Sequence, residues 1–127
     1  MRFVALNLYT RFWERYSLDT MTVSQLPLVF ERRQLSEWRR RWHVSELAAF
    51  GSILRPEFGP SSDVDLLVTF GPDAAWSLID HERMEQELTE IIGRPVDLVS
   101  RSGIEQSANW IRRHEILATA TPLDVEG

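Results

Sequence analysis

An apolar segment headed by two acids constrains this chain more than any other feature. Residues 63–70 read Asp-Val-Asp-Leu-Leu-Val-Thr-Phe. The apolar run is typical of a buried strand, in which side chains two apart point to the same face. Asp63 and Asp65 would then share a face, with their Cα atoms ~6.5–7 Å apart. Two ionised carboxylates that close repel each other unless a cation lies between them, and Mg²⁺, which prefers oxygen ligands, suits them.

A glycine–serine pair lies upstream of these acids. Gly51-Ser52 follows a predicted strand at 44–50 and begins a predicted short helix at 52–55, which Pro56 stops. Glycine lets the backbone approach a ligand closely, and the N–H groups at a helix start attract anions. The Ser52 hydroxyl can donate to a phosphate oxygen. Arg55 is either a further phosphate ligand or an ordinary exposed arginine. The segment therefore predicts a phosphate site next to a metal site, as a nucleoside triphosphate with Mg²⁺ requires.

A third acid fits the same site. Asp97 is the one carboxylate in the apolar segment 96–100, which reads Val-Asp-Leu-Val-Ser. If this strand lies beside the strand at 63–70, Asp97 can join Asp63 and Asp65. A third carboxylate allows a second metal ion, or a base for an attacking hydroxyl. Taken alone, Asp97 could be a strand-edge acid bonded to water.

The remaining pattern predicts an α+β domain, a small mixed sheet flanked by helices. Apolar spacing predicts a helix over 27–42, a capped helix over 77–92 that Gly93 ends, and a helix over 104–118. Residues 122–125 would add a short strand or an arm. We expect one domain over 27–127. Residues 1–26 form an N-terminal extension, of which 1–20 are either an additional element or an over-long gene start before Met21.

The sequence also predicts which charged and aromatic residues are buried and which face water. In the helix over 77–92 we expect a buried stripe and an acidic face toward water, the stripe being Met84, Leu88 and Ile91 and the acids Glu82, Glu85, Glu87 and Glu90. The tryptophans are core residues by default, and three of them are also candidates for a protein interface: Trp38, Trp42 and Trp110. The histidines His43, His81 and His114 lack metal-ligand spacing and are expected to be structural or exposed.

Composition narrows the class of protein. A chain of 127 residues fits one domain with one core. The absence of cysteine excludes disulfides and thiolate metal sites, and all 14 basic residues are arginine, which excludes lysine Schiff-base chemistry. A net charge of −5 argues against broad nucleic-acid binding. No apolar run approaches the length of a membrane span, so we expect no membrane and take the cytoplasm as the default compartment.

These motifs together resemble a known family. Gly51-Ser52, the spacing to Ser62-Asp63-Val64-Asp65-Leu66, and the segment Arg94-Pro95-Val96-Asp97-Leu98-Val99 are similar to the DNA polymerase beta-like nucleotidyltransferases, in particular the minimal nucleotidyltransferases, over residues 44–125. The resemblance implies a nucleotidyltransferase fold. It also implies that the three aspartates hold metal and carry catalysis, and that the glycine–serine pair binds the nucleotide, with Arg55 and Ser62 as further candidates. The chain has Pro56 where the family often has glycine after the arginine.

The resemblance also implies a function. Members of the minimal branch are commonly antitoxins paired with a helical toxin of the HEPN class, a ribonuclease. We therefore expect a Mg²⁺-dependent enzyme, with one or two ions, that transfers AMP from ATP to a tyrosine hydroxyl of such a toxin within a hetero-oligomer. Two alternatives stay open. The chain could be a non-catalytic module that neutralises a toxin by covering it, or a small-molecule nucleotidyltransferase similar to the aminoglycoside-modifying branch, although it has no room for an acceptor domain.

Overall fold

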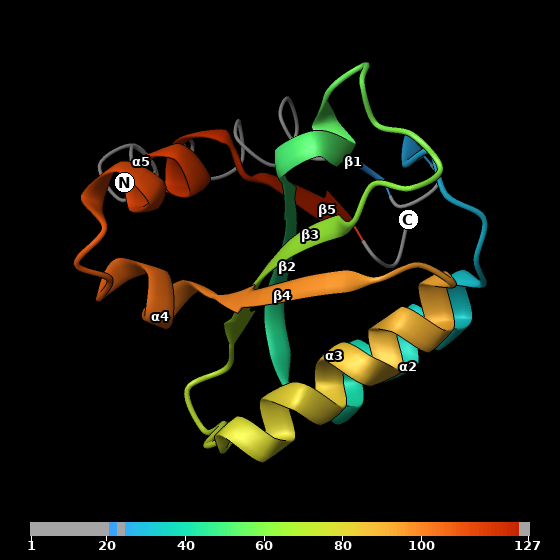
Figure 1. The fold of residues 1–127 in the computed structure, drawn as a ribbon. Helices are drawn as coiled ribbons and strands as arrows, with labels where there is room; N and C mark the ends of the chain where they lie inside the picture. The colour runs from blue at the N-terminus through green and yellow to red at the C-terminus, as the bar shows by residue number, and fades with distance from the viewer. Residues whose placement is uncertain (1–20, 23–24, 125–127) are drawn as a thin grey trace, which may run out of the picture.

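A five-stranded mixed sheet organises the chain. The computed structural model describes residues 21–22 and 25–124. The strands lie in the order β1-β5-β2-β3-β4 (Figure 1). Their bounds are β1 Met21–Thr22, β2 Val44–Phe50, β3 Val64–Phe70, β4 Val96–Ser100 and β5 Thr121–Asp124. The helices are α2 Arg32–Arg41, the 3₁₀ turn η3 Gly51–Leu54, α3 Leu78–Ile92, α4 Arg101–Glu105 and α5 Trp110–Thr119.

The strand pairing confirms the expected α+β class. β2 runs antiparallel to both β3 and β5, whereas β3 and β4 are parallel and are joined through α3. A parallel pair needs such a crossover helix, which returns the chain to the starting end of the sheet. β1 pairs in parallel with β5 at the other edge. Residues 64–70 therefore form β3, which lies between the central strand β2 and the edge strand β4.

The two faces of the sheet bury different amounts of apolar surface. Alternate residues of β3, such as Val64 and Leu66, point to the face covered by α2 and α3, where the larger cluster of buried side chains lies. Leu67 points to the other face, where Ile104 of α4 and Ile116 of α5 cover a much smaller cluster. Figure 1 shows α2 and α3 together on one side and α4 and α5 on the other. The thinly covered face therefore leaves room for a site.

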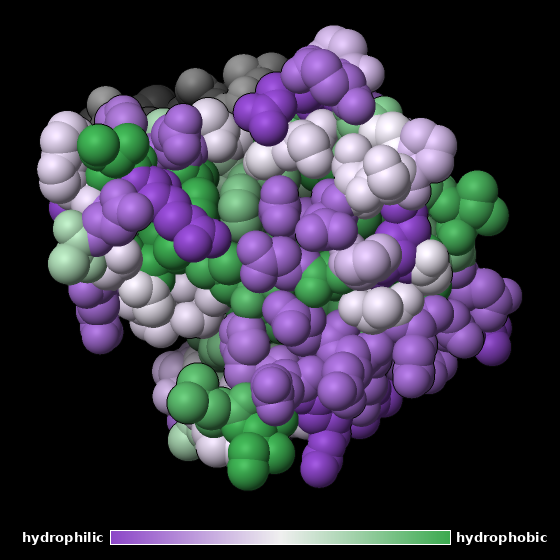
Figure 2. All heavy atoms as spheres, viewed as in Figure 1, coloured by the Kyte–Doolittle hydropathy of each residue, from purple (hydrophilic) through white to green (hydrophobic). Residues whose placement is uncertain are grey.

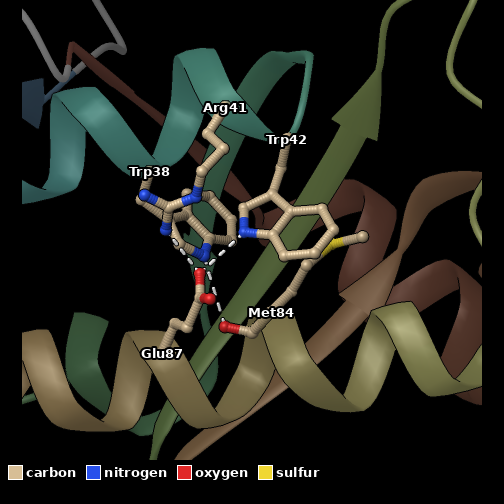
Figure 3. A network of polar contacts seen from close by, with 5 residues as sticks. All are labelled: Trp38, Arg41, Trp42, Met84 and Glu87. Atoms are coloured by element: carbon tan, nitrogen blue, oxygen red, sulfur yellow. Dashed lines mark hydrogen bonds and ion pairs between the residues drawn. The ribbon is translucent and has the colours of Figure 1, made fainter.

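A polar network joins α2 to α3 on the well-covered face (Figure 3). Trp38 is fully buried, and its Nε1 donates to the backbone oxygen of Met84 at 3.3 Å. The carboxylate of Glu87 accepts from Nε1 of Trp42 at 2.8 Å and from the guanidinium of Arg41. Trp38 and Trp42 belong to the core, which is the default expectation for tryptophan, and not to the surface that an interface would need. The expectation that Glu87 faces water was wrong, because its partly exposed carboxylate is bonded to Arg41 and Trp42.

Helix α2 begins later than its apolar spacing predicts. The segment before Arg32 is not helical, and Leu26, Leu28 and Phe30 pack against the core while Pro27 and Val29 are exposed. This alternation has the period of a strand, not of a helix. The sequence supports both periods between 26 and 35, because Leu28 and Leu35 also match helical spacing. The packing of alternate residues goes with a backbone that bends at Leu26 and Pro27 and is extended at Glu31.

The later elements match the expectations more closely. Ser77 and Asp80 form the expected capping box, and Gly93 ends α3 in the left-handed region at φ 77°. Met84 and Leu88 are buried as expected, with Ile92 in place of the half-buried Ile91. Glu85 is the second acid that does not face water. It accepts a hydrogen bond from the backbone N–H of Leu98 at 2.8 Å, so α3 holds the outer strand β4.

The expected helix over 104–118 is divided in two. α4 ends at Glu105, and the Asn109 side chain accepts from the backbone N–H of Arg112 at 3.1 Å, which caps a separate helix α5. The side-chain hydrogen bond of Asn109 to the backbone competes with the hydrogen bonds of a continuous helix. Apolar spacing alone does not reveal this competition. The expected last strand is present as β5, Thr121–Asp124.

The part of the chain before residue 27 is described only in pieces. β1 pairs with β5, and Leu26 lies in the larger core cluster. The remainder of the expected extension, residues 1–20 together with 23–24, lies outside the described residues. Within the described ranges, every helix is too short or too polar to cross a lipid bilayer.

Candidate functional site

The register of three neighbouring strands brings the predicted residues together. Asp65 of β3 pairs directly with Phe50 of β2 on one side and with Asp97 of β4 on the other. Residues paired across adjacent strands point to the same face of a sheet. Asp65 and Asp97 therefore lie side by side on the thinly covered face. Asp63, two residues before Asp65 and just outside β3, is exposed. The expectation that β4 lies beside β3 is confirmed.

Gly51 comes into contact with this acidic pair. It follows Phe50 directly and has a φ of 75°, a left-handed conformation that favours glycine. A Cβ added to Gly51 would lie only 2.3 Å from Oδ2 of Asp65. No side chain fits there without moving the carboxylate. The turn and the carboxylate therefore occupy one site, although they are separated by thirteen residues of sequence, positions 52–64.

The turn itself is shorter than an α-helix. η3 is a single 3₁₀ turn over Gly51–Leu54, and Arg55 after it is extended at φ −119° and ψ 154°. Pro56 accounts for this, since a proline disfavours helical backbone in the residue before it. The half-buried Ser52 makes no side-chain hydrogen bond to another described residue, so its hydroxyl is free to bind a ligand.

The acids influence one another through space. Burial raises the pKa of the Asp65 carboxyl, and the negative charges of Asp97 and Asp63 raise it further. The positive charges of Arg112 and Arg55 act in the opposite direction but do not outweigh them. Asp65 is thus a partly desolvated carboxylate with two acidic neighbours. Such an arrangement is destabilising without a cation and is typical of functional sites.

The loop before Asp63 is fixed by an arginine. The guanidinium of Arg94 donates to the backbone oxygens of Gly59 and Ser62, the latter at 2.7 Å, and lies 4.3 Å from the centre of the Phe58 ring. The hydroxyl of Ser62 accepts from the backbone N–H of Gly59 at 3.1 Å, which closes the same loop. Ser62 therefore has a partner within the loop, and its expected contact with a nucleotide stays a prediction.

A pocket opens beside Gly51. It has a volume of about 400 Å³ and lies between η3 and α5, lined by Phe50, Gly51, Leu54, Arg55, Arg112, Glu115, Ile116 and Thr119. Arg55 is exposed and its Nε lies 3.7 Å from a carboxylate oxygen of Glu57. Sequence reasoning placed Gly51 and Arg55 here but missed the wall contributed by α5. The only sequence signal for that wall is the pair Arg112-Arg113 in a predicted helix, which by itself indicates an exposed helix face.

The acids are not gathered around one point in this conformation. Among residues 21–22 and 25–124, no three histidine, aspartate or glutamate side chains lie close enough together to enclose a metal ion. The donor set nevertheless fits Mg²⁺, because carboxylates supply hard oxygen ligands, and the negative charges of Asp97 and Asp63 act on Asp65 with a repulsion that a cation would relieve. The histidines do not contribute: His81, for example, bonds through Nε2 to the backbone oxygen of Leu98 at 2.6 Å.

Comparisons with known proteins agree with this geometry. Residues 31–118 match the family model described as a nucleotidyltransferase domain. The protein adenylyltransferase MntA of Thermococcus cleftensis is 39% identical over 69 residues, which cover 54% of this chain and 68% of that protein. A solved structure described as a minimal nucleotidyltransferase is 34% identical and covers 72% of this chain and 88% of its own, with a TM-score of 0.56.

A more distant structure shares the fold. It is a toxin–antitoxin crystal structure with AMP-PNP, 16% identical, covering 72% of this chain and 71% of its own, with a TM-score of 0.56. The family match extends over more than half of the chain and includes the turn, all three aspartates and both arginines of the pocket. This chain therefore belongs to the nucleotidyltransferase family, as a minimal member homologous to the MntA proteins.

Proposed function

We propose that this chain is a Mg²⁺-dependent protein adenylyltransferase that transfers AMP from ATP to a tyrosine hydroxyl of a helical HEPN-class toxin, with which it forms a hetero-oligomer. One observation carries the proposal: the direct pairing of Phe50, Asp65 and Asp97 across three strands. Because this pairing brings Gly51 next to Asp65 and Asp97, it supports a phosphate site beside a metal site. The relative named a protein adenylyltransferase and the toxin–antitoxin structure with AMP-PNP, an ATP analogue, support the substrate and the partner.

The residues have distinct roles in this proposal. Ser52 and the backbone of Gly51 bind the phosphates, and Arg55 adds positive charge at the open side of the pocket. Asp63, Asp65 and Asp97 would hold Mg²⁺. When bound, the ion supplies charge neutralisation of the phosphates and stabilises a displacement at phosphorus.

The proposed transfer is a displacement at the α-phosphorus of ATP. The tyrosine oxygen forms a bond to the α-phosphorus, and the bond from that phosphorus to the oxygen bridging to the β-phosphate breaks, so that pyrophosphate leaves. Asp97 is exposed and, in this proposal, accepts the hydroxyl proton. The chain itself positions the nucleotide and the base, and the acceptor comes from the partner.

The surface offers places for a partner to bind. Leu78 and Ile79 at the start of α3 are 86% and 69% exposed, and Trp110 and Ile111 at the start of α5 are 65% and 58% exposed. Figure 2 shows apolar surface over these two helix starts. Exposed apolar groups of this size are typical of protein interfaces. The expectation that Trp110 is an interface residue is therefore compatible with its exposure.

Intact-protein mass spectrometry tests the proposal. The purified chain is mixed with ATP, Mg²⁺ and the product of the neighbouring gene. We expect the partner to gain the mass of one adenylyl group, and to gain nothing when Asp63→Asn replaces the wild type. A stable complex without added mass would contradict the enzyme and favour the non-catalytic module. Transfer to an aminoglycoside in the absence of any protein partner would favour the small-molecule enzyme instead.

A further inference from the structure

The wall of the pocket opposite η3 consists of helix α5. Ile116 of this helix is buried against Phe50, the residue before Gly51. Arg112 lies four residues earlier, and residues four apart lie on the same side of a helix. Arg112 is therefore placed over the end of the sheet where β2 and β3 meet, and it lines the pocket together with Gly51 and Arg55.

The Arg112 side chain has no structural task in the described part of the chain. Its backbone N–H is bonded to the cap residue Asn109, but its exposed guanidinium makes no hydrogen bond or ion pair with any residue described. The neighbouring Arg113 differs, because its guanidinium donates to the backbone oxygen of Ser107 at 3.1 Å. Of this arginine pair, one holds the helix start and the other is free to bind a ligand.

Arg112 and Arg55 line the same pocket. One guanidinium thus comes from the chain after η3 and the other from α5, on either side of the same pocket. Two guanidiniums facing a shared space, with a glycine turn at its base, form a suitable arrangement for a chain of phosphates.

We propose that Arg112 is a phosphate-binding residue, which acts with Arg55 to hold the triphosphate of the nucleotide between η3 and α5. The inference rests on the proposed function and adds a residue to it. Glu115 lies on the same wall one turn after Arg112, and its negative charge opposes an anion in the pocket. Arg112 and Glu115 therefore act in opposite directions on phosphate affinity.

Nucleotide binding measured by calorimetry tests the assignment without any partner protein. The probes are ATP, adenosine and inorganic tripolyphosphate, each at the same free Mg²⁺ concentration. We expect Arg112→Ala to weaken ATP and tripolyphosphate about tenfold, the effect of one charge-assisted hydrogen bond at an open site, and to leave adenosine unchanged. Arg112→Lys should recover part of the loss, because it keeps the charge but not the fork of donors. Glu115→Gln should tighten both phosphate probes.

Matched controls separate this role from a structural one. Arg33 is an exposed arginine on α2, on the other face of the sheet, and Arg33→Ala removes the same charge from the chain. Thermal unfolding of Arg112→Ala should match that of Arg33→Ala, since neither guanidinium is buried. The difference in phosphate affinity should shrink as salt is raised.

The outcomes distinguish the two proposals. If wild type and Arg112→Ala bind ATP equally well, Arg112 has no role in binding phosphate, and the proposed function still stands. Equal weakening by Arg112→Ala and Arg33→Ala would also overturn it, since net charge alone would explain the effect. Wild type that binds neither ATP nor tripolyphosphate would overturn the proposed function and this inference together.

Discussion

A Cβ on Gly51 would collide with the carboxylate of Asp65 at 2.3 Å. Two motifs that are separate in the sequence thus depend on each other in the fold. The glycine is required by two independent facts, a φ of 75° and the position of Asp65 beside it. The first is a property of the turn, and the second is a property of the site.

Substitution of Gly51 should therefore damage the site more than the fold. We expect Gly51→Ala to cost ~1–2 kcal/mol of stability from the left-handed backbone, with a further cost from the displaced Asp65 side chain. Adenylyl transfer should fall by at least about a hundredfold, because displacement of a catalytic group by about 1 Å can cost that much. Chemical denaturation and initial transfer rates measure the two effects.

Gly93 provides the matched control. Its φ of 77° is almost the same, but a Cβ there meets nothing within 4 Å. Gly93→Ala should cost only the backbone term, ~1–2 kcal/mol, and leave the transfer rate of the folded protein unchanged. Equal activity in the two variants would mean that the contact between Gly51 and Asp65 has no functional role.

The site aspartates should be required for activity although they lower the stability of the metal-free protein. Asp65→Asn removes a partly buried charge next to Asp63 and Asp97, so we expect the metal-free protein to unfold at a higher temperature. The same variant should lose adenylyl transfer by at least about a hundredfold, since a ligand of the proposed metal is gone. Differential scanning fluorimetry in EDTA and in Mg²⁺ measures the stability effect.

Mg²⁺ gives this prediction a second readout. An ion that binds only the folded state stabilises it, so Mg²⁺ should raise the melting temperature of wild type. Asp65→Asn should respond much less. Asp73→Asn, at an exposed aspartate in the loop after β3, controls for the loss of one negative charge. Stabilisation of all three proteins by the same amount would place the ion elsewhere.

Arg94 should hold the loop that leads into Asp63. Its guanidinium bonds the backbone at Gly59 and Ser62 and lies over Phe58. We expect Arg94→Ala to cost ~2–3 kcal/mol of stability, since it leaves two partly buried carbonyls without their donor. Hydrogen exchange of residues 58–62 should accelerate while exchange in α2 stays as in wild type. Unchanged exchange in the loop would show that Ser62 and Gly59 close it without help.

Much of the site could be predicted from the sequence because its residues lie in short motifs that can be recognised within a few positions. The strand at 63–70, the turn at Gly51 and the third acid all depend on patterns within a few residues. Asp65 and Asp97 are neighbours because β3 and β4 are parallel and in direct register, which the crossover through α3 produces. Sequence reasoning needed only the assumption that these two strands are adjacent.

The features that sequence reasoning missed depend on tertiary contacts. Leu26, Leu28 and Phe30 fit two periods, and only their packing against the core selects a backbone that is not helical. Glu87 has the spacing of a solvent-facing acid, but two donors from α2 approach it. The pair Arg112-Arg113 by itself indicates only an exposed helix face, because the place of Arg112 in the pocket follows from how α5 packs on Phe50.

The link between α2 and α3 should make stability depend on pH. Burial raises the pKa of Glu87, but the hydrogen bonds from Trp42 and Arg41 and the charges of Arg41 and Arg83 outweigh it, so the pKa lies below the ordinary 4.5. A carboxyl with a lowered pKa in the folded state stabilises the fold above its unfolded pKa. That contribution should be complete at neutral pH and should disappear as the pH falls below 4.5 through the folded value.

Urea unfolding of wild type and Glu87→Gln between pH 7 and pH 3 measures this contribution. Wild type should be the more stable protein at neutral pH, by an amount that stays constant down to about pH 5 and then decreases, because the glutamine has no charge to lose. Glu90→Gln, at an exposed acid on the same helix, should follow wild type throughout. A gap between wild type and Glu87→Gln that persists unchanged at pH 3 would show that the network depends on shape and hydrogen bonding rather than on the charge of Glu87.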